Sequence, residues 1–399
     1  MARDDGQVSF AFSVMNLIKN IVGTSILAAS FGVARSGVVP SIIICLIFAV
    51  LSGLSFGLIG ALSGEADIKS TPSYRGVCEK YIHRKSGVWI DLLMAIYTFP
   101  ACIAYSVFLT DCIRIMLPSE NLFVTSRTFI CLILTFTILL PLCCISSFRK
   151  LSFTSLIGIC SILYCYIFVS TDLAKNSDPE IIQSALWWPP SGSLLGFFPM
   201  ANIYASCYVV HYNSAKFYKD MQNPTPRRFY AVSLLSNAFV LIFCGSFAVL
   251  GFARFGPDTP ANLLVGYSGA YAVWIATCVS VITTFPFVFD AGRNSFISAV
   301  EGFELASPNT LFWATTLFWV PVLSLSAIFI TSLSLVVGVS GSVCGMTVGF
   351  TLPGLIFANR ARMKQQSKLF VLLGYTLMVL GMILTVVGLI SMFVSVNSG

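Results

Sequence analysis

The sequence predicts an all-α polytopic membrane protein, and three observations support that prediction. Of the 399 residues, 57% are hydrophobic and only 10% are charged, and the mean hydropathy is +0.88. The apolar residues form long continuous runs without the alternation of membrane β-strands. Basic residues gather in alternate breaks between these runs. Because a spanning helix needs about 20 apolar residues, the runs are interpreted as transmembrane helices.

Eleven spans follow from the apolar runs and from the charged or Pro/Gly-rich breaks between them. The first five are expected at 8–34, 38–63, 87–117, 126–146 and 152–172. A polar stretch at 173–193 follows, and six more are expected at 194–215, 229–252, 268–290, 311–331, 333–358 and 369–394. We expect no disulfide framework, because the cysteines lie almost entirely within spans. No separate soluble domain or signal peptide is expected either.

The charge distribution predicts the topology. With a cytoplasmic N-terminus, most of the 23 lysine and arginine residues fall on the cytoplasmic side. The exceptions are Lys19 within a span and, on the other side, Arg35, Arg114, Arg127, Lys175 and Arg254. An odd number of spans then places the C-terminus outside the cytoplasm. The net charge of +7 therefore indicates topology and not nucleic-acid binding.

The first span carries polar residues where a lipid-facing helix carries apolar ones. Asn16, Lys19 and Asn20 precede the cluster Gly23-Thr24-Ser25. If the helix unwinds at this cluster, the first N–H groups of its outer half can hold a carboxylate. Discontinuous helices of this kind mark transporter sites near the midplane. Small residues at a tight helix contact are the alternative explanation.

Lys19 favours a functional interpretation of this segment. It lies about 16 Å into the span at 1.5 Å per residue, near the middle of a hydrocarbon core of about 30 Å. A lysine there costs about 2.5 to 3.5 kcal/mol on insertion scales. We therefore expect a function for Lys19, with a purely structural ion pair as the alternative.

Four stretches of the chain together show a family resemblance. They are Asn16 to Leu27, Pro100 to Asp111, His211 to Phe229 with its continuation to Gly256, and Thr284-Phe285-Pro286 with Arg293 seven residues beyond the proline. In order and spacing they resemble the amino acid/auxin permease family of the amino acid-polyamine-cation superfamily. Ser25 departs from the pattern by replacing a glycine, and Asp290-Ala291 stands where Phe-Pro is more usual.

The resemblance implies a transporter fold with a five-plus-five inverted repeat and an eleventh helix. The first repeat would occupy 1–172, the loop 173–193, the second repeat 194–358, and span 11 with its tail 359–399. Spans 1 and 6 would be broken at the substrate site. The break in span 6 is expected within Ala205 to Val209.

By the same resemblance, an amino acid substrate would bind at the two breaks. Its carboxylate would meet the backbone of span 1, its amino group would meet freed carbonyls of span 6, and Tyr105 would cover the carboxylate. The implied substrate-binding residues are Gly23, Thr24, Ser25, Ile26, Tyr105, Tyr204, Ser206, Cys207 and Tyr208. Simple helix packing is the alternative for Tyr105.

A cation site is implied beside the substrate site. Its candidate residues are Lys19, Asn20, Ser280, Thr283, Thr284 and His211. Lys19 stands where sodium-coupled relatives tend to carry asparagine, so we expect its ammonium to replace sodium and transport to be sodium-independent. Lys19 could also exchange a proton during the cycle. His211 is a candidate proton relay, although a hydrogen-bonded structural histidine is the favoured alternative.

These observations predict a secondary active transporter of amino acids, neutral ones first, in the plasma membrane or the membrane of an acidic organelle. The expected partners are the amino acid, the lipid bilayer and a proton as coupling ion, and we expect a monomer without cofactor or metal. Alternatives are an amino acid sensor or a carrier of another small amine or carboxylate. An enzyme is disfavoured by the lack of catalytic motifs. A channel is disfavoured because polar residues concentrate on a few spans.

Overall fold

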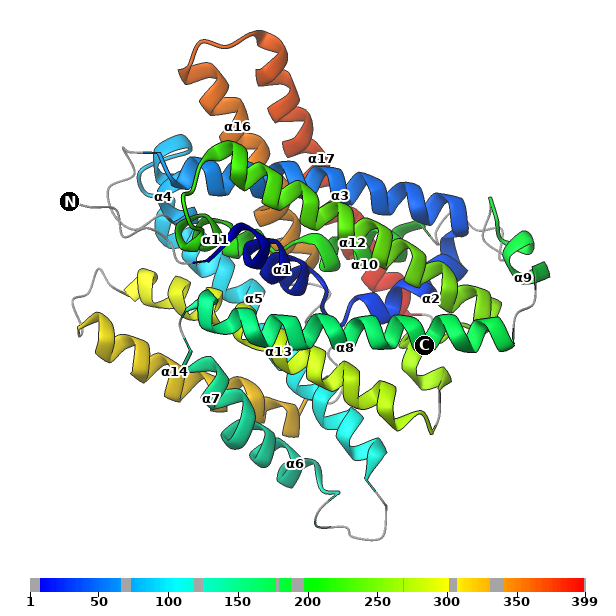
Figure 1. Cartoon of the computed structure of the whole chain (residues 1–399). Coiled ribbons are helices and arrows are strands. Elements are labelled where there is room, and N and C mark those ends of the chain that lie inside the picture. Colours follow the sequence, from blue (N-terminus) through cyan, green and yellow to red (C-terminus); the bar gives the residue numbers. More distant parts are fainter. Residues whose placement is uncertain are drawn as a thin grey trace.

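The fold is all-helical in the described part of the chain, as the sequence predicted. The computed structural model describes residues 8–65, 73–117, 123, 125–145, 147–176, 179–187, 197–267, 269–300, 307–330 and 341–397. Within these ranges the only extended pairing is a single parallel bridge between Val8 and Met221. The helices form one bundle in which several long rods run side by side (Figure 1).

Eight helices among the described residues are long and apolar enough to cross a membrane. They are α3 (Val38–Ser63), α5 (Gly87–Met116), α8 (Phe148–Lys175), α12 (Pro226–Phe255), α13 (Tyr271–Val300), α14 (Pro308–Leu325), α16 (Leu352–Met363) with the π-helical turns that precede it from Gly341, and α17 (Lys368–Asn397). The bent pair α1 (Phe10–Ile21) and α2 (Ile26–Ser36) forms a ninth span when counted as one.

Two more predicted spans contain helix but no continuous helix of spanning length. The first consists of α6 (Arg127–Ile133), a π-helical turn and α7 (Leu140–Cys143), and the second of α10 (Phe197–Tyr208) and α11 (Ser214–Asp220). The predicted total of eleven is therefore not confirmed. That total, the inverted repeat and its boundaries stay predictions, and part of the tenth predicted span, 333–340, lies outside the described residues.

Short polar signals set where several helices begin. The Thr225 side chain accepts a hydrogen bond from the Arg228 N–H, with a proline at the first position of α12. Ser307 caps α14 in the same way, again before a proline. Both patterns satisfy N–H groups that a helix start leaves without partners. Two short helices, α4 (Tyr74–Tyr81) and α9 (Pro179–Ser184), lie between the long ones.

Helix α13 lies at the centre of the bundle and α17 at its edge. The most apolar window of α13 is 72% buried, whereas that of α17 is 11% buried. α13 packs on α5 and α8, α12 packs on α3, and α1 lies among α8, α12 and α13 (Figure 1). α16 and α17 pair with each other and project from one side of the bundle (Figure 1). The interrupted segment between α1 and α2 is thus enclosed by other helices.

Candidate functional site

The first predicted span is broken where the Gly-Thr-Ser cluster lies. α1 ends at Ile21 and α2 begins at Ile26, with a 58° bend between them. Val22 has a ψ of 90°, and the Gly23 N–H turns back to donate to the Ile21 carbonyl at 3.0 Å. Ser25 makes no side-chain capping hydrogen bond, and the Leu27 and Ala28 N–H groups donate to the Thr24 and Ser25 carbonyls. The N–H groups of Thr24, Ser25 and Ile26 have no backbone acceptor among the described residues. The positive end of a helix is therefore available to an anion.

Side chains from two other helices cover this break. A Cβ atom on Gly23 would lie only 2.8 Å from the Tyr105 hydroxyl oxygen, so a glycine is needed for Tyr105 to approach the backbone this closely. From α10, the Cys207 Sγ lies 3.7 Å from the Ile21 carbonyl oxygen. The break in span 1 is thus in direct contact with α5 and α10.

Span 6 is also broken, between Tyr208 and Ser214. The predicted break was within Ala205 to Val209, so the observed break overlaps the end of that range and extends beyond it. The Tyr208 carbonyl accepts a hydrogen bond from the Ser52 hydroxyl at 2.8 Å, and the Val209 carbonyl accepts one from the Tyr97 hydroxyl at 2.9 Å. An amino group could reach these two carbonyls only through their second lone pairs.

A cavity lies between the two breaks. Its empty volume is about 640 Å³ when its open mouth is included. It is lined by seven of the residues that the sequence proposed: Asn20, Gly23, Thr24, Ser25, Tyr105, Ser206 and Cys207. No charged side chain lines the cavity in the part of the chain that the structure describes. The arrangement fits a small solute without a net side-chain charge.

Three residues that were proposed to bind substrate lie outside the cavity lining. Tyr204 bonds to the Ser41 hydroxyl at 3.1 Å, and the Tyr208 hydroxyl lies 3.4 Å from the Cys45 Sγ. Both side chains therefore face α3, because residues four apart share a face of a helix. Ile26 is 6% exposed and packs in the apolar core. The geometry gives no support to a substrate contact by these three residues.

The cavity also has walls that sequence reasoning did not identify. These are Ile21, Tyr97, Thr98, Ala101, Ala104, Val209, Val210, Tyr212, Val288 and Gly341. The α5 members could have been found from Tyr105, because residues 97, 101, 104 and 105 recur at helical spacing on one face. Val288 and Gly341 have no such local signal, since they reach the cavity from distant parts of the sequence.

Lys19 lies outside the cavity and is fully buried. Its Nζ donates to the Ser280 hydroxyl at 3.0 Å, to the Val22 carbonyl at 3.3 Å and to the Thr284 hydroxyl. No carboxylate pairs with Lys19 among the described residues. The ammonium group thus joins the break in span 1 to α13 through neutral oxygen atoms alone.

A glycine on α8 provides the space for this lysine. A Cβ atom on Gly158 would lie 2.2 Å from the Lys19 Cε and 2.3 Å from the Thr283 Oγ1. The Thr283 hydroxyl itself donates to the Ser280 carbonyl at 2.9 Å. Thr283 therefore lies beside the lysine, and α1, α8 and α13 together enclose the ammonium group.

The other two residues of the proposed cation site lie elsewhere. Asn20 lines the cavity. His211 is fully buried within the break in span 6, where its Nε2 lies 2.7 Å from the Ser55 hydroxyl and its ring packs edge-on against Phe56 and Phe350. This geometry fits a hydrogen-bonded structural histidine, and proton relay by His211 stays a prediction.

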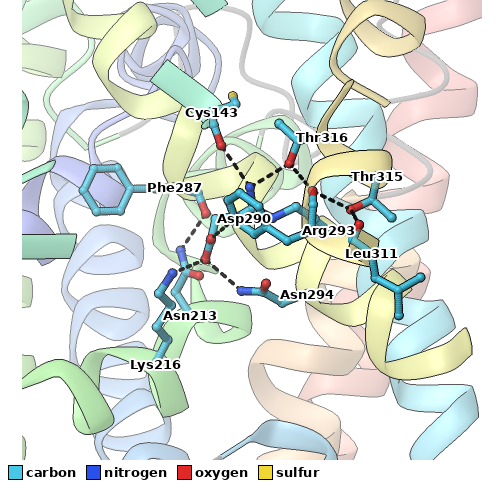
Figure 2. A network of polar contacts seen from close by, with 11 residues as sticks. Cys143, Asn213, Lys216, Phe287, Asp290, Arg293, Asn294, Leu311, Thr315 and Thr316 are labelled. Atoms are coloured by element: carbon cyan, nitrogen blue, oxygen red, sulfur yellow. Dashed lines mark hydrogen bonds and ion pairs between the residues drawn. The ribbon is translucent and has the colours of Figure 1, made fainter. Parts of the chain in front are cut away.

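A second buried polar cluster surrounds Asp290 in α13 (Figure 2). The carboxylate pairs with Lys216 of α11 at 2.5 Å and with Arg293 of its own helix, and it accepts a hydrogen bond from the Asn294 side chain at 2.9 Å. Asp290 was expected near the end of a span, but α13 continues to Val300 and the residue is 2% exposed. Its two cationic partners make this burial possible.

Arg293 connects the cluster to two further helices. Its guanidinium donates to the Cys143 carbonyl at 2.9 Å and to the Thr316 hydroxyl at 3.0 Å (Figure 2). Its Cζ lies 4.0 Å from the centre of the Phe312 ring, within the range of a cation–π contact. The cluster therefore ties α11 and α13 to the end of α7 and to the first half of α14.

Comparisons with known proteins agree with this arrangement. Residues 6–396 match the family described as "Transmembrane amino acid transporter protein". The amino acid transporter AVT6E of Arabidopsis thaliana is 22% identical, covering 97% of this chain and 83% of that protein. Sodium-coupled neutral amino acid transporter 7 of Xenopus laevis is 26% identical, covering 88% of this chain and 80% of that protein.

Solved structures share the fold at low sequence identity. A sodium-coupled sialic acid symporter in a substrate-bound, outward-open state superposes with a TM-score of 0.60 at 12% identity, covering 98% of this chain and 90% of that one. At this identity the likeness concerns the fold alone. It places the bundle among transporter folds.

Proposed function

The chain belongs to the family of transmembrane amino acid transporter proteins, and we propose that it is a secondary active transporter of neutral amino acids. The observation that carries this proposal is the cavity between the two broken helices, which no charged side chain lines among the described residues. A free amino acid brings its own carboxylate and ammonium groups. A charged side chain on the substrate would find no counter-charge in this lining.

The substrate carboxylate is placed at the start of α2. The N–H groups of Thr24, Ser25 and Ile26, for which no backbone acceptor is found among the described residues, offer hydrogen bonds and the positive end of the helix dipole. The Tyr105 hydroxyl, which approaches Gly23 closely, adds a donor and covers the site. The amino group would then face the carbonyls at the break in span 6.

Counterflow of labelled amino acids in proteoliposomes tests this placement. The wild type is expected to exchange neutral amino acids in preference to acidic or basic ones. Tyr105→Phe and Thr24→Ala should weaken apparent affinity, whereas Tyr204→Phe, which faces α3, is the matched control and should behave as wild type. Binding without exchange would support an amino acid sensor in place of a transporter.

We also propose that the Lys19 ammonium stands in for a sodium ion. Its three acceptors are a backbone carbonyl and two hydroxyls, which are oxygen ligands of the kind that hard cations use. Transport would then be independent of sodium, with a proton as the candidate coupling ion. The location of the ammonium between α1 and α13 would let it link the two helices during alternating access.

Replacement of sodium by choline tests this role directly. Wild-type uptake should be the same in both salts. Lys19→Asn, which supplies an amide oxygen in place of the ammonium, should make uptake respond to sodium, while Lys19→Met should not respond. Stimulation of the wild type by sodium would contradict the proposal.

We propose the eleven-span topology as the architecture of this transporter. Its support is that the two breaks, in α1–α2 and in α10–α11, fall in the first span of each proposed repeat. Insertion of an Asn-X-Thr acceptor into 173–193 or at the C-terminus should give glycosylated protein, because both would lie outside the cytoplasm. The same acceptor inserted between Lys216 and Arg228 should stay unmodified.

A further inference from the structure

Asn20 has a feature that the cation site does not explain. It lies in the last turn of α1, is 3% exposed, and lines the cavity. Its side-chain nitrogen, Nδ2, has no hydrogen-bond partner in the described part of the chain. Leaving a buried donor unsatisfied costs about 1–3 kcal/mol, so a partner that enters the cavity would remove this cost.

The orientation of the Asn20 amide is determined by a neighbouring asparagine. The Nδ2 of Asn213 donates to the Phe287 carbonyl at 2.9 Å and to the Oδ1 of Asn20 at 3.5 Å. Both hydrogens of that amide are thereby used. If the oxygen and nitrogen of the Asn20 amide exchanged places, its NH₂ group would face the NH₂ group of Asn213, and two donors would meet. Asn20 must therefore direct its oxygen at Asn213, which leaves its buried NH₂ group without a partner among the described residues, on a residue that lines the cavity.

Three other polar side chains of the lining already donate within the protein. The hydroxyls of Tyr97, Thr98 and Ser206 donate to backbone carbonyls at 2.9 Å in each case. Asn20 is the lining residue that combines deep burial with an unused donor among the described residues. No acceptor of the described residues bonds to this nitrogen, so an acceptor on a ligand in the cavity would be its partner.

The position of Asn20 on α1 indicates which acceptor it takes. It lies at the C-terminal end of α1, where the helix dipole is negative, whereas the start of α2 is positive. A carboxylate is favoured at the start of α2 and disfavoured at the end of α1. The Lys19 ammonium, which could offset this, is occupied by Val22, Ser280 and Thr284 and does not line the cavity. A neutral oxygen fits Asn20 better than a charged one.

We infer that Asn20 binds the side chain of the substrate and selects neutral amino acids whose side chain carries an acceptor oxygen, such as an amide or a hydroxyl. The inference rests on the proposed function, because it needs the substrate carboxylate to be bound at Gly23 to Ser25. Asn20 is then a specificity-determining residue, and Asn213 is the positioning residue that orients it.

Matched substrate pairs test this assignment in proteoliposome counterflow. Threonine and valine have nearly the same shape, as do asparagine and leucine, but only the first of each pair offers a side-chain acceptor. Wild type should prefer threonine and asparagine. In Asn20→Leu this preference should fall by about 5- to 100-fold, the range expected for one hydrogen bond to a buried donor, while affinity for valine and leucine stays within about twofold.

Controls separate the role of Asn20 from folding and from the proposed function. Asn237→Leu replaces another buried asparagine, 2% exposed and outside the cavity lining, and should keep the wild-type preference. If Asn20→Leu does not fold, Asn20→Ala, judged folded by alanine exchange, should show the same loss. An equal loss for all four substrates, or no loss, would overturn the Asn20 assignment and leave amino acid transport intact. Failure of the wild type to exchange any amino acid would overturn both.

Discussion

Two cationic sites lie along α13, and their charges are stabilised in different ways. Lys19 is bound to Ser280 and Thr284 with no carboxylate partner among the described residues. Six residues after Thr284 in α13, Asp290 pairs with both Lys216 and Arg293. One site thus holds a charge through neutral oxygen atoms, and the other holds charges through ion pairs.

The difference predicts that the Lys19 site is functional and that the Asp290 cluster is structural. Inside a protein, an ion pair that loses one partner leaves an uncompensated charge, so such a cluster resists change. An ammonium held only by hydroxyls and a carbonyl can be removed without leaving an opposite charge behind. We therefore expect the Asp290 cluster to stabilise the bundle and the Lys19 site to serve transport.

Asp290→Asn should have the largest effect on stability. It removes the carboxylate that Lys216 and Arg293 share, and breaking a buried pair typically costs about 3–5 kcal/mol. The apparent melting temperature of detergent-purified protein should fall sharply. Asp111→Asn is the matched control, because Asp111 pairs with Arg127 at 2.7 Å but its side chain is 42% exposed, where a pair contributes about 0–1 kcal/mol. Equal effects of the two variants would show that burial does not distinguish them.

Gly158→Ala should have the next largest effect, because it disturbs the Lys19 site by adding one methyl group. The new Cβ would lie 2.2 Å from the Lys19 Cε, and overpacking of this kind costs about 1–3 kcal/mol. Gly245→Ala, where a Cβ meets no atom within 4 Å, should leave the melting temperature unchanged. The double variant Gly158→Ala with Lys19→Ala should recover stability. If it does not, Lys19 is not what the methyl group displaces.

Lys19→Met should change stability less than either of these variants, by less than about 1 kcal/mol, because replacing a buried charge by an apolar side chain of similar length is often neutral or stabilising. Amino acid uptake should nevertheless fall to background. Parallel measurements of melting temperature and uptake check both halves of this expectation. A large loss of stability would assign Lys19 to the same structural class as the Asp290 cluster.

Glu65→Gln should have the smallest effect, and it should depend on pH. Glu65 follows α3 and pairs with Lys80 at 2.8 Å and with Arg360 at 3.5 Å. Burial opposes ionisation of this carboxyl, but hydrogen bonds from Lys80 and Tyr81 outweigh it and lower the pKa of Glu65 below its usual value. The pair should contribute at most about 1 kcal/mol.

The sign of this pH dependence follows from the lowered pKa of Glu65. The contribution of Glu65 is present above the unfolded pKa of about 4.3 and is lost as the pH falls through the lower folded value. Wild type and Glu65→Gln should therefore differ in melting temperature at pH 7 and converge in acid. A difference that grows as the pH falls would contradict the expected direction.

Sequence reasoning located the break in span 1 but not the directions in which Lys19 and Asn20 point. The break at Gly23 to Ser25 was predicted correctly, because small and polar residues within an apolar run are a local signal. Lys19 and Asn20 were assigned together to a cation site, but they lie on different sides of α1. Adjacent residues on a helix point about 100° apart, and here Asn20 lines the cavity while Lys19 does not. Their shared cation site stays a prediction. The direction of each was set by how α1 packs against α13.

The sequence by itself determined that the chain is a bundle of membrane helices, where the first helix is interrupted, and which family it belongs to. These follow from hydropathy, from small and polar residues within apolar runs, and from motifs in order, which are properties of neighbouring residues. Only the tertiary structure decided that Gly158 makes room for Lys19, that Asp290 is buried between Lys216 and Arg293, and that the Asn20 side-chain nitrogen has no partner among the described residues. Those facts depend on helices distant in sequence and on the rotation of each helix about its axis, which composition and spacing do not specify.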